Sequence, residues 1–393
     1  MKPIPYGRQE ITQADIQAVV ETLQSDFLTQ GPKVEEFERK FADYIGAKYA
    51  LAVANGTAAL HLCTLALGVQ PGVRVITTPI TFAASANCVQ YAGGEVYFAD
   101  IDPETGLMDL HKVRELIESK PAGFFSGLIP VDFAGYPLDL EAYRQLADAH
   151  GLWIIEDACH APGGYFTDSA GQQQPCGNGT FADLAIFSFH PVKHIATGEG
   201  GMITTNRQDL FEALLLLRTH GITKNPALLQ QNPGGWYYEM QTLGYNYRMP
   251  DILTALGISQ LNRAPEGLEK RAQIAARYDA AFRPQPGIRI LNPQPYAPEK
   301  NQGLRHAYHL YVIQVEDRKG LYDHLKAHNI FAQVHYIPVH TMPYYQQQGW
   351  QAGDFPLAEN YYARCLSLPM YPSLTPEEQK FVIAQVEAFL NKP

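Results

Sequence analysis

Short apolar segments alternate with helical segments along the first two-thirds of the chain, and this alternation restricts the fold more than any other feature. Parallel strands need long crossover connections, which are usually helices. The pattern therefore predicts an α/β fold: a mostly parallel sheet with helices on both faces. The apolar runs are LAVAN, VRVITT, EVYFAD, FFSGLIPVDF, LWIIEDA, LAIFSF and GMITTN. Apolar periodicity also predicts helices at about 13–25, capped by Thr12, and at about 33–45.

A chain of 393 residues exceeds the usual size of one domain, so two domains are expected. We assign residues 1–250 to a large domain that contains the parallel sheet. After MPDILTALGISQL the rhythm changes to helices, a Pro-rich loop (NPQPYAPEKNQG) and a few strands with flanking helices. Residues 251–393 are therefore predicted to form a smaller α+β C-terminal domain.

Charge and cysteine usage exclude several classes of protein. The formal net charge is −10 without clustered cations, so no face for nucleic acid or anionic lipid is expected. The five cysteines lie far apart, which signals neither disulfides nor a metal site and fits a reducing cytoplasm. The N-terminus has no secretory signal pattern, and no apolar run approaches the ~18 residues of a membrane span.

Residues that follow the strands of an open α/β sheet are the first candidates for a ligand site. After LAVAN, Gly56 and Thr57 open a helix whose N–H groups could bind a phosphate. The alternative is a capped helix behind a tight turn, because short Gly motifs give many false matches.

The strand LWIIEDA ends on Asp157, and His160 follows three residues later. A carboxylate after so apolar a strand needs a cationic or hydrogen-bonding partner. Asp157 could instead cap the next helix, and His160 could be a structural histidine.

The stretch SFHPVKHIATGEGG places Ser188 near a strand end and Lys193 in the following loop. A loop lysine is usually solvated surface. Here apolar residues precede it, and such surroundings lower the pKa of an amine and make it nucleophilic. A phosphate site, a buried carboxylate and an activated amine on one sheet edge are the set that pyridoxal phosphate (PLP) requires.

The stretches NGTAAL, EDACHA, FSFHPVKHIATGEGG and GYNYRM resemble the nucleotide-sugar aminotransferases, which are fold type I PLP enzymes, over nearly the whole chain. A narrower resemblance is to the family members of pseudaminic acid biosynthesis, which aminate C4 of a UDP-linked 4-keto-6-deoxy-N-acetyl-L-hexosamine. It lies in the stretches DFLTQGP, TTPITFAASAN, GISQLNRAPE and AQVHYIPVH. The resemblance implies L-glutamate as the amino donor and a homodimer.

The same resemblance implies a role for individual residues. Lys193 would bond to the cofactor, and Asp157 would pair with its ring nitrogen. The other implied cofactor contacts are Gly56, Thr57, Phe82, His160, Ser188 and, from the second subunit, Asn246. The implied sugar-nucleotide contacts are Tyr6, Asp26, Phe27, Leu28, Thr29, Gln333, Val334, His335 and Tyr336.

Other interpretations of these residues and of the function stay open. Phe82 could be a core aromatic, LTQGP a helix stop and QVHY an edge strand. The enzyme could aminate C3 or C4 of another UDP- or dTDP-linked sugar, or be a non-catalytic sugar-nucleotide-binding relative. A related dehydratase is disfavoured, because those enzymes have histidine in place of the lysine. The polar stretch YFTDSAGQQQPCGNGT is expected to be a surface loop.

Overall fold

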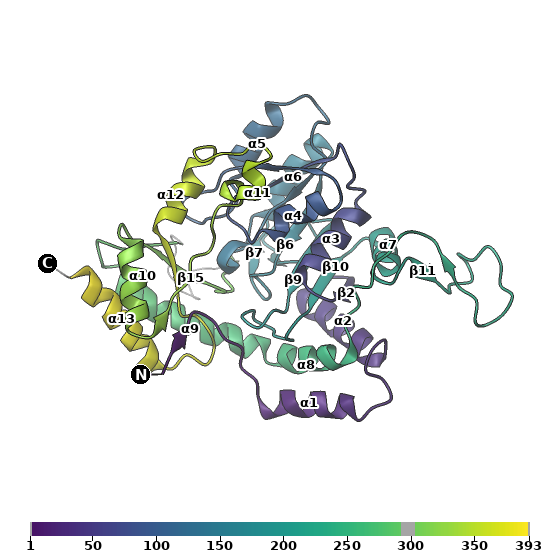
Figure 1. The fold of residues 1–393 in the computed structure, drawn as a ribbon, viewed down its shortest axis with the longest axis horizontal. Coiled ribbons are helices and arrows are strands. Elements are labelled where there is room, and N and C mark those ends of the chain that lie inside the picture. The colour runs from purple at the N-terminus through teal and green to yellow at the C-terminus, as the bar shows by residue number, and fades with distance from the viewer. Residues whose placement is uncertain (1, 292–302, 392–393) are drawn as a thin grey trace.

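The computed structural model describes residues 2–291 and 303–391, and its centre is a seven-stranded sheet (Figure 1). Six strands run parallel, and β10 is antiparallel to both of its neighbours. This confirms the predicted α/β fold with a mostly parallel sheet. In spatial order the strands are β2 (Tyr49–Val53), β10 (Gly201–Thr205), β9 (Leu184–Ser188), β6 (Trp153–Asp157), β5 (Gly127–Ile129), β3 (Arg74–Thr77) and β4 (Glu95–Phe98).

Both faces of the sheet are covered by other elements, and this burial explains why its strands are continuous hydrophobic runs. On β2, Ala50 and Ala52 point toward α2 (Pro32–Ile45), while Leu51 and Val53 belong to the larger core with α3 (Gly56–Ala66). The other helices of this region are α4 (Ala84–Tyr91), α5 (Leu110–Glu118), α6 (Leu140–His150) and α7 (Gln208–Arg218). None of the helices in the described part of the chain is long and apolar enough to cross a membrane.

The first helix, α1 (Gln13–Leu23), begins where the sequence indicates. Thr12 and Asp15 form a capping box, in which each side chain accepts a hydrogen bond from the other residue's backbone N–H. The helix ends two residues before the predicted end at 25. α1 and α2 both pack against α8 (Asp251–Asn262), which continues into α9 (Ala264–Phe282) along the base of the molecule (Figure 1).

The C-terminal region has a second hydrophobic core around a three-stranded antiparallel sheet of β13 (Arg289–Ile290), β15 (Tyr311–Gln314) and β17 (Cys365–Leu368). Its helices include α10 (Arg318–Ala327), α11 (Pro343–Gln346), α12 (Pro356–Arg364) and α13 (Pro376–Leu390). The N-terminal strand β1 (Ile4–Pro5) crosses to this region and pairs with β16 (Ile330–Phe331). The division at residues 250 and 251 stays a prediction, and most of the Pro-rich loop, 292–302, lies outside the described residues.

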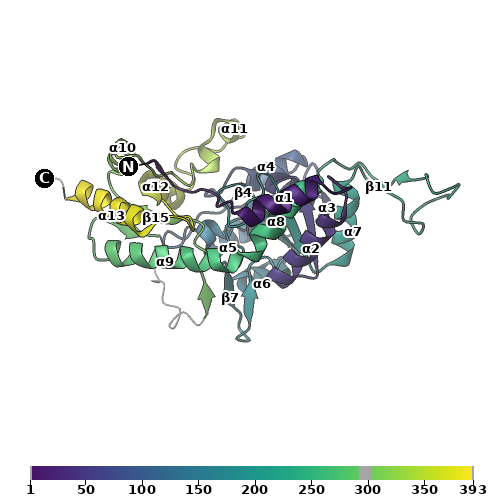
Figure 2. The same ribbon diagram turned by 90° about the horizontal axis from the view of Figure 1, so that it is seen from below.

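Two segments differ from a simple loop. The expectation of a surface loop at 165–180 is wrong: β7 (Tyr165–Thr167) and β8 (Gln173–Pro175) form a hairpin that also pairs with β14 (Leu304–Arg305). Phe166 and Cys176 are buried, which anchors the hairpin to the body. Between α7 and α8, β11 (Ile222–Thr223) and β12 (Glu239–Met240) close an arm, residues 222–243, that projects from the body (Figures 1 and 2).

Candidate active site

Sheet topology brings the three predicted strand ends to one edge. β6 and β9 are parallel neighbours, with Asp157 opposite Ile186. β10 is antiparallel to both β9 and β2, so β2 runs in the direction of β9. Gly56, Asp157 and Ser188 therefore lie at the same carboxyl edge, where an open α/β sheet places its ligand.

The start of α3 offers a site for an anion. Asn55 caps the helix, its Oδ1 accepting a hydrogen bond from the N–H of Ala58 at 2.8 Å. The N–H groups of Gly56 and Thr57 in the first turn have no partner within the helix and carry its positive dipole end. A Cβ at position 56 would lie 3.1 Å from Cβ of Ser188, so glycine lets the start of α3 approach Ser188 closely, and both border the same anion site.

Asp157 is buried and held by two donors. Its Oδ2 accepts a hydrogen bond from Ser85 Oγ at 2.7 Å, and its Oδ1 accepts one from the N–H of Cys159 at 3.2 Å. Thr81 Oγ1 lies 2.8 Å from Ser85 Oγ and extends the chain of hydroxyls. The carboxylate is therefore fixed in orientation, as a partner for a charged ring nitrogen must be.

Lys193 follows β9 in a tight turn, in which its backbone N–H donates to the carbonyl of His190 at 2.8 Å. Its Nζ lies 3.4 Å from Nε2 of His309. Burial lowers the pKa of Lys193, while Cys159 and Asp157 act in the opposite direction. The residue is thus a partly desolvated amine and not a free surface lysine, which is the state a nucleophilic lysine needs.

Aromatic residues from distant segments surround this amine and acid. His160 Nδ1 accepts a hydrogen bond from the N–H of Ala134 at 3.2 Å, and its Nε2 lies 3.2 Å from the hydroxyl of Tyr336. Phe82 is 62% exposed, so it is not a core aromatic, and its ring centroid lies 6.3 Å from that of Tyr336. An exposed aromatic face beside a phosphate site, an acid and an amine fits the ring of PLP.

The substrate residues predicted in QVHY are divided by the structure. His335 is buried, with Nδ1 2.8 Å from Ser367 Oγ and its ring 5.0 Å from that of Tyr6. Val334 is half-buried, and Gln333 is exposed with its backbone bridged to Ser367. QVHY is therefore not a regular edge strand. Of the predicted substrate residues, Tyr336 contacts His160, and Tyr6 packs on His335.

The remaining predicted residues lie elsewhere on the chain. Asp26, Phe27, Leu28 and Thr29 are exposed in the connection between α1 and α2, and Asn246 is exposed at the base of the arm, bridged to Thr219. Within the described ranges, no hydrogen bond or ring contact joins them to Lys193 or Asp157. Their roles stay predictions, and that of Asn246 was predicted for the second subunit.

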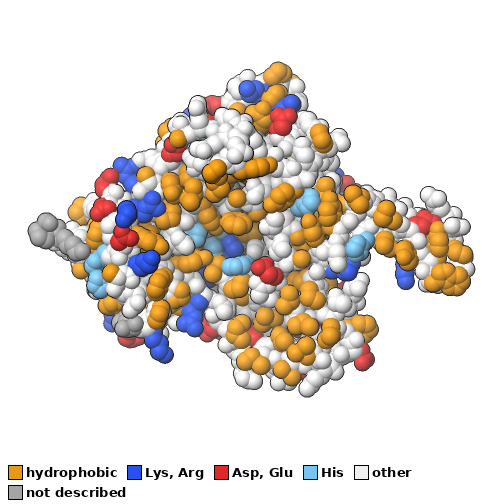
Figure 3. Space-filling view, in the orientation of Figure 1, with side chains coloured by type: hydrophobic (Ala, Val, Ile, Leu, Met, Phe, Trp, Pro, Cys, Tyr) orange, Lys and Arg blue, Asp and Glu red, His pale blue; other side chains and the backbone are white. Residues whose placement is uncertain are grey.

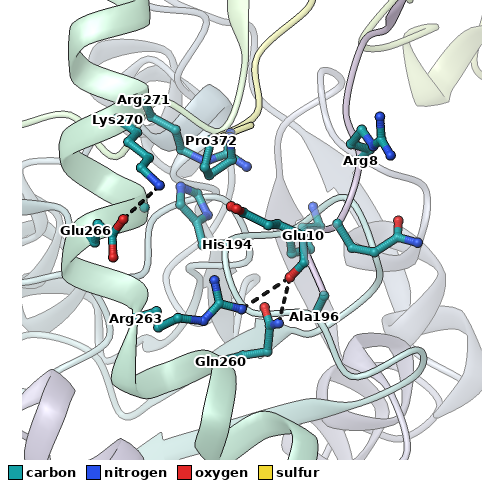
Figure 4. A pocket seen from close by; sticks show the side chains of 13 residues that line it. Arg8, Glu10, His194, Ala196, Gln260, Arg263, Glu266, Lys270, Arg271 and Pro372 are labelled. Carbon is teal, nitrogen blue, oxygen red and sulfur yellow. Dashed lines mark hydrogen bonds and ion pairs between the residues drawn. The ribbon is translucent and has the colours of Figure 1, made fainter. Parts of the chain in front are cut away.

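A small cavity of about 30 Å³ adjoins Lys193 between the N-terminal segment, α8 and α9 (Figure 4). Arg8, Lys270 and Arg271 are among its cationic lining residues. Arg263 donates to the backbone carbonyl of Glu10 at 3.2 Å, which fixes the N-terminal segment against α8. Figure 3 shows histidine and basic side chains in the hollow of the molecular face above this region.

Sequence reasoning missed two members of the site. Ser85, within TFAASAN, binds Asp157 across 72 positions, and His309, within HAYHLYV, contacts Lys193 across 116 positions. A serine in an alanine-rich helix and a histidine just before an apolar strand carry no local signal of a polar site. Only the tertiary fold brings them to the edge of the sheet.

A buried acid pair lies directly behind the site. Single ligand-type atoms of Asp132, Glu156 and Cys176 lie within 4.8 Å of one another, and Glu156 accepts a hydrogen bond from the N–H of Gly177 at 2.8 Å. Burial raises the pKa of both carboxyls, and their mutual repulsion adds to the rise for Glu156. The folded pair therefore retains a proton that the unfolded chain releases.

This pair predicts a pH dependence of stability. Because the pKa values are raised in the folded state, their stabilisation is complete below about pH 4 and is lost as the pH rises, by up to about 1.4 kcal/mol per pH unit for one proton. We expect Glu156→Gln, which keeps a donor toward Asp132, to flatten the fall in urea midpoint between about pH 5 and 8. The exposed Glu118→Gln is the control and should leave the slope unchanged. An equal slope in the wild type and Glu156→Gln would contradict the shared proton.

Comparison with known proteins agrees with this geometry. The Bacillus subtilis spore coat polysaccharide biosynthesis protein SpsC is 40% identical, over 98% of this chain and 96% of its own length. A Campylobacter jejuni UDP-4-amino-4,6-dideoxy-N-acetyl-beta-L-altrosamine transaminase is 36% identical, over 99% of this chain and 98% of its own.

Solved structures match equally well. The Helicobacter pylori aminotransferase PseC, involved in pseudaminic acid biosynthesis, has a TM-score of 0.86 and 30% identity, with 99% of each chain covered. Streptococcus pneumoniae Spr1654 in its PLP form has a TM-score of 0.86 and 29% identity, with 98% of each chain covered. The DegT/DnrJ/EryC1/StrS aminotransferase family matches residues 9–387, and the chain therefore belongs to this family of PLP-dependent sugar aminotransferases.

Proposed function

We propose that the enzyme transfers the amino group of L-glutamate to C4 of UDP-2-acetamido-2,6-dideoxy-beta-L-arabino-hex-4-ulose. The product is UDP-4-amino-4,6-dideoxy-N-acetyl-beta-L-altrosamine, a step of pseudaminic acid biosynthesis and the reaction of EC 2.6.1.92. The observation that carries this proposal is the pair of Campylobacter jejuni relatives named for this product, 36% and 34% identical over 99% of the chain. The fold of Helicobacter pylori PseC supports it.

The candidate site divides the work of such a reaction among its residues. Bound PLP supplies an aldehyde that bonds to amines and a ring that accepts the electrons released at the reacting carbon. The start of α3 and Ser188 would hold the phosphate, and Asp157 would keep a proton on the ring nitrogen. Lys193 would take up and return the proton of the donor Cα. Phe82 would cover one face of the ring, and Tyr6, His335 and Tyr336 would contact the sugar.

We further propose that two copies of the chain complete each site, with Asn246 of the partner subunit and its 26–29 segment contributing. Apolar side chains are exposed on the arm and on the α1 region (Figure 3). Isolated exposed apolar residues are ordinary, but such gathered patches are typical of protein interfaces. These side chains are Leu228, Trp236, Tyr238, Met240 and Leu243 on the arm, and Ile16, Val20, Leu23, Phe27 and Leu28 around α1.

The arm is the sharpest test of this assembly. Trp236 and Leu243 are each 74% exposed, and aromatic anchors at interfaces contribute about 2 kcal/mol or more. We expect Trp236→Asp with Leu243→Asp to weaken dimerisation by at least about 30-fold and to weaken PLP binding, measured by light scattering and absorbance. Lys319→Glu, on α10, is the matched surface control. A monomeric wild type with full activity would refute the assembly.

A panel of keto-sugars tests the substrate. The pure enzyme is assayed with glutamate and UDP-, GDP- and dTDP-linked 4-keto-6-deoxy sugars, because a GDP-perosamine synthase is also 32% identical. We expect kcat/KM for the UDP-beta-L-arabino-hex-4-ulose to exceed the others by about 100-fold, with the product configuration assigned by NMR. A GDP or dTDP preference would replace the proposed sugar and leave the family assignment intact. A colourless protein that takes up no PLP would favour a non-catalytic role.

We also propose that the enzyme works in the cytoplasm. All five cysteines are unpaired, and four of them are buried. Unpaired thiols at every position suit a reducing compartment. Detection of the enzyme in an exported fraction of its host would contradict this location.

A further inference from the structure

The amine of Lys193 contacts a residue that the expected cofactor chemistry does not use. Nζ lies 3.4 Å from Nε2 of His309, which comes from the segment before β15. We propose that His309 is the positioning residue that holds the amine of Lys193 whenever that amine is not bonded to the cofactor. The inference rests on the transamination chemistry of the family and does not depend on which sugar is the acceptor.

His309 is fixed in place by its backbone. The buried Arg271 donates from Nη1 to the carbonyls of Tyr308 and His309, at 3.1 and 3.3 Å. Ala307 and Leu310, on either side, donate their N–H groups to the carbonyls of Gly135 and Ala134. Gly135 has φ of 95°, and a Cβ there would lie 3.0 Å from the N of His309, so only glycine allows this close approach. The imidazole is therefore presented by a rigid support.

Two further histidine rings lie beside His309. The ring of His160 is tilted against it, with centroids 4.3 Å apart, and accepts at Nδ1 from a backbone N–H, so a neutral His160 carries its proton on Nε2. His194 Nε2 faces the carbonyl of Ala307 at 2.8 Å, so it too carries the proton on Nε2. Burial lowers the pKa of His309, and the charge of Lys193 lowers it further. A neutral His309 can then accept an N–H of Lys193 at Nε2.

A held amine serves the part of the reaction in which Lys193 is released. During transamination Lys193 would be free of the cofactor for part of the cycle, and a flexible lysine would then have to stay within reach of the reacting carbon. Lys193 would take up the proton of the donor Cα, while His309 would only accept a hydrogen bond and exchange no proton. Holding one geometry lowers the entropic part of the barrier.

The test measures Lys193 in the cofactor-free enzyme. Trace reductive methylation between about pH 6 and 10, followed by peptide mass spectrometry, gives the pH midpoint of Lys193 reactivity in wild type, His309→Phe, His309→Gln and His306→Phe. Phe keeps the ring but removes the acceptor, whereas Gln keeps an acceptor oxygen. His306 is the control, because its ring stacks on Tyr308 at 4.0 Å in the same segment. The charged or titratable groups around the pair are Asp157, Cys159, His160, His194, Arg271 and His335, and all remain in every variant.

We expect the midpoint to fall by about 1 pH unit in His309→Phe, because the charged amine loses a hydrogen bond, and to stay near wild type in His309→Gln and His306→Phe. In the holoenzyme, kcat of His309→Phe should fall about tenfold with KM for the sugar and PLP affinity unchanged. An unchanged midpoint in His309→Phe, or equal shifts in His309→Phe and His306→Phe, would overturn the proposal. If His309→Phe is insoluble, His309→Leu, which also lacks an acceptor, is measured in its place.

Discussion

Lys193→Ala is expected to lower kcat by at least about 10⁴-fold, because the variant loses both the bond to the cofactor and the group that moves the proton. Lys193→Arg should be equally inactive, since a guanidinium stays protonated and cannot bond to the aldehyde. Folding should survive, because Lys193 lies in a turn and is only partly buried.

Borohydride reduction of the PLP-loaded protein gives a direct measurement. Wild type should carry the cofactor covalently on the peptide that contains Lys193, and Lys193→Ala should carry none. The exposed Lys319→Ala serves as the control and should behave as wild type. Reduction that labels a different lysine would remove Lys193 from the reaction and with it the proposed mechanism.

Asp157→Ala is expected to reduce kcat by on the order of 10²–10³-fold while weakening PLP binding far less. Removing one member of a buried charge pair costs about 3–5 kcal/mol. The pair here would be the Asp157 carboxylate and the protonated ring nitrogen, and its loss would raise the barrier for the flow of electrons into the ring. The proposed phosphate contacts at α3 are untouched by the change, so retention of the cofactor should persist.

Thr57→Val is the control variant, with the reverse effect expected: PLP binding is lowered and turnover is kept. It removes a hydroxyl from the phosphate site, and we expect weaker PLP binding with kcat near wild type at saturating cofactor. Equal losses of turnover and of PLP affinity in Asp157→Ala would show that Asp157 only supports the cofactor. Kinetics at several PLP concentrations, with absorbance to measure occupancy, separate the two outcomes.

The sheet and its carboxyl edge could be predicted because the signals are local. β2, β6 and β9 are short buried runs, and the polar residues that end them, such as Asp157 and Ser188, follow directly in the sequence. The capping box of α1 is a four-residue pattern and was equally readable. Local patterns of this kind determine where elements begin and which residues reach the edge.

The remaining parts of the site depend on contacts that no local pattern encodes. Ser85 and His309 reach Asp157 and Lys193 across 72 and 116 positions. IFAQVHY has the composition of a strand, but only Ile330–Phe331 pairs with β1, since the chain then turns to bring Tyr336 to His160. The 165–175 hairpin was missed for the same reason, because its stability comes from pairing with β14 far along the chain.

The crossing of β1 to β16 places both ends of the polypeptide in one lobe. β16 packs on α10, which packs on α13, and Figures 1 and 2 show β1 and α13 at the end of the molecule opposite the arm. For immobilisation or fusion to a carrier, a tether at either end would therefore leave the arm accessible. Removal of the first six residues, in contrast, would delete Tyr6 and β1, the strand that pairs with β16 in the C-terminal region.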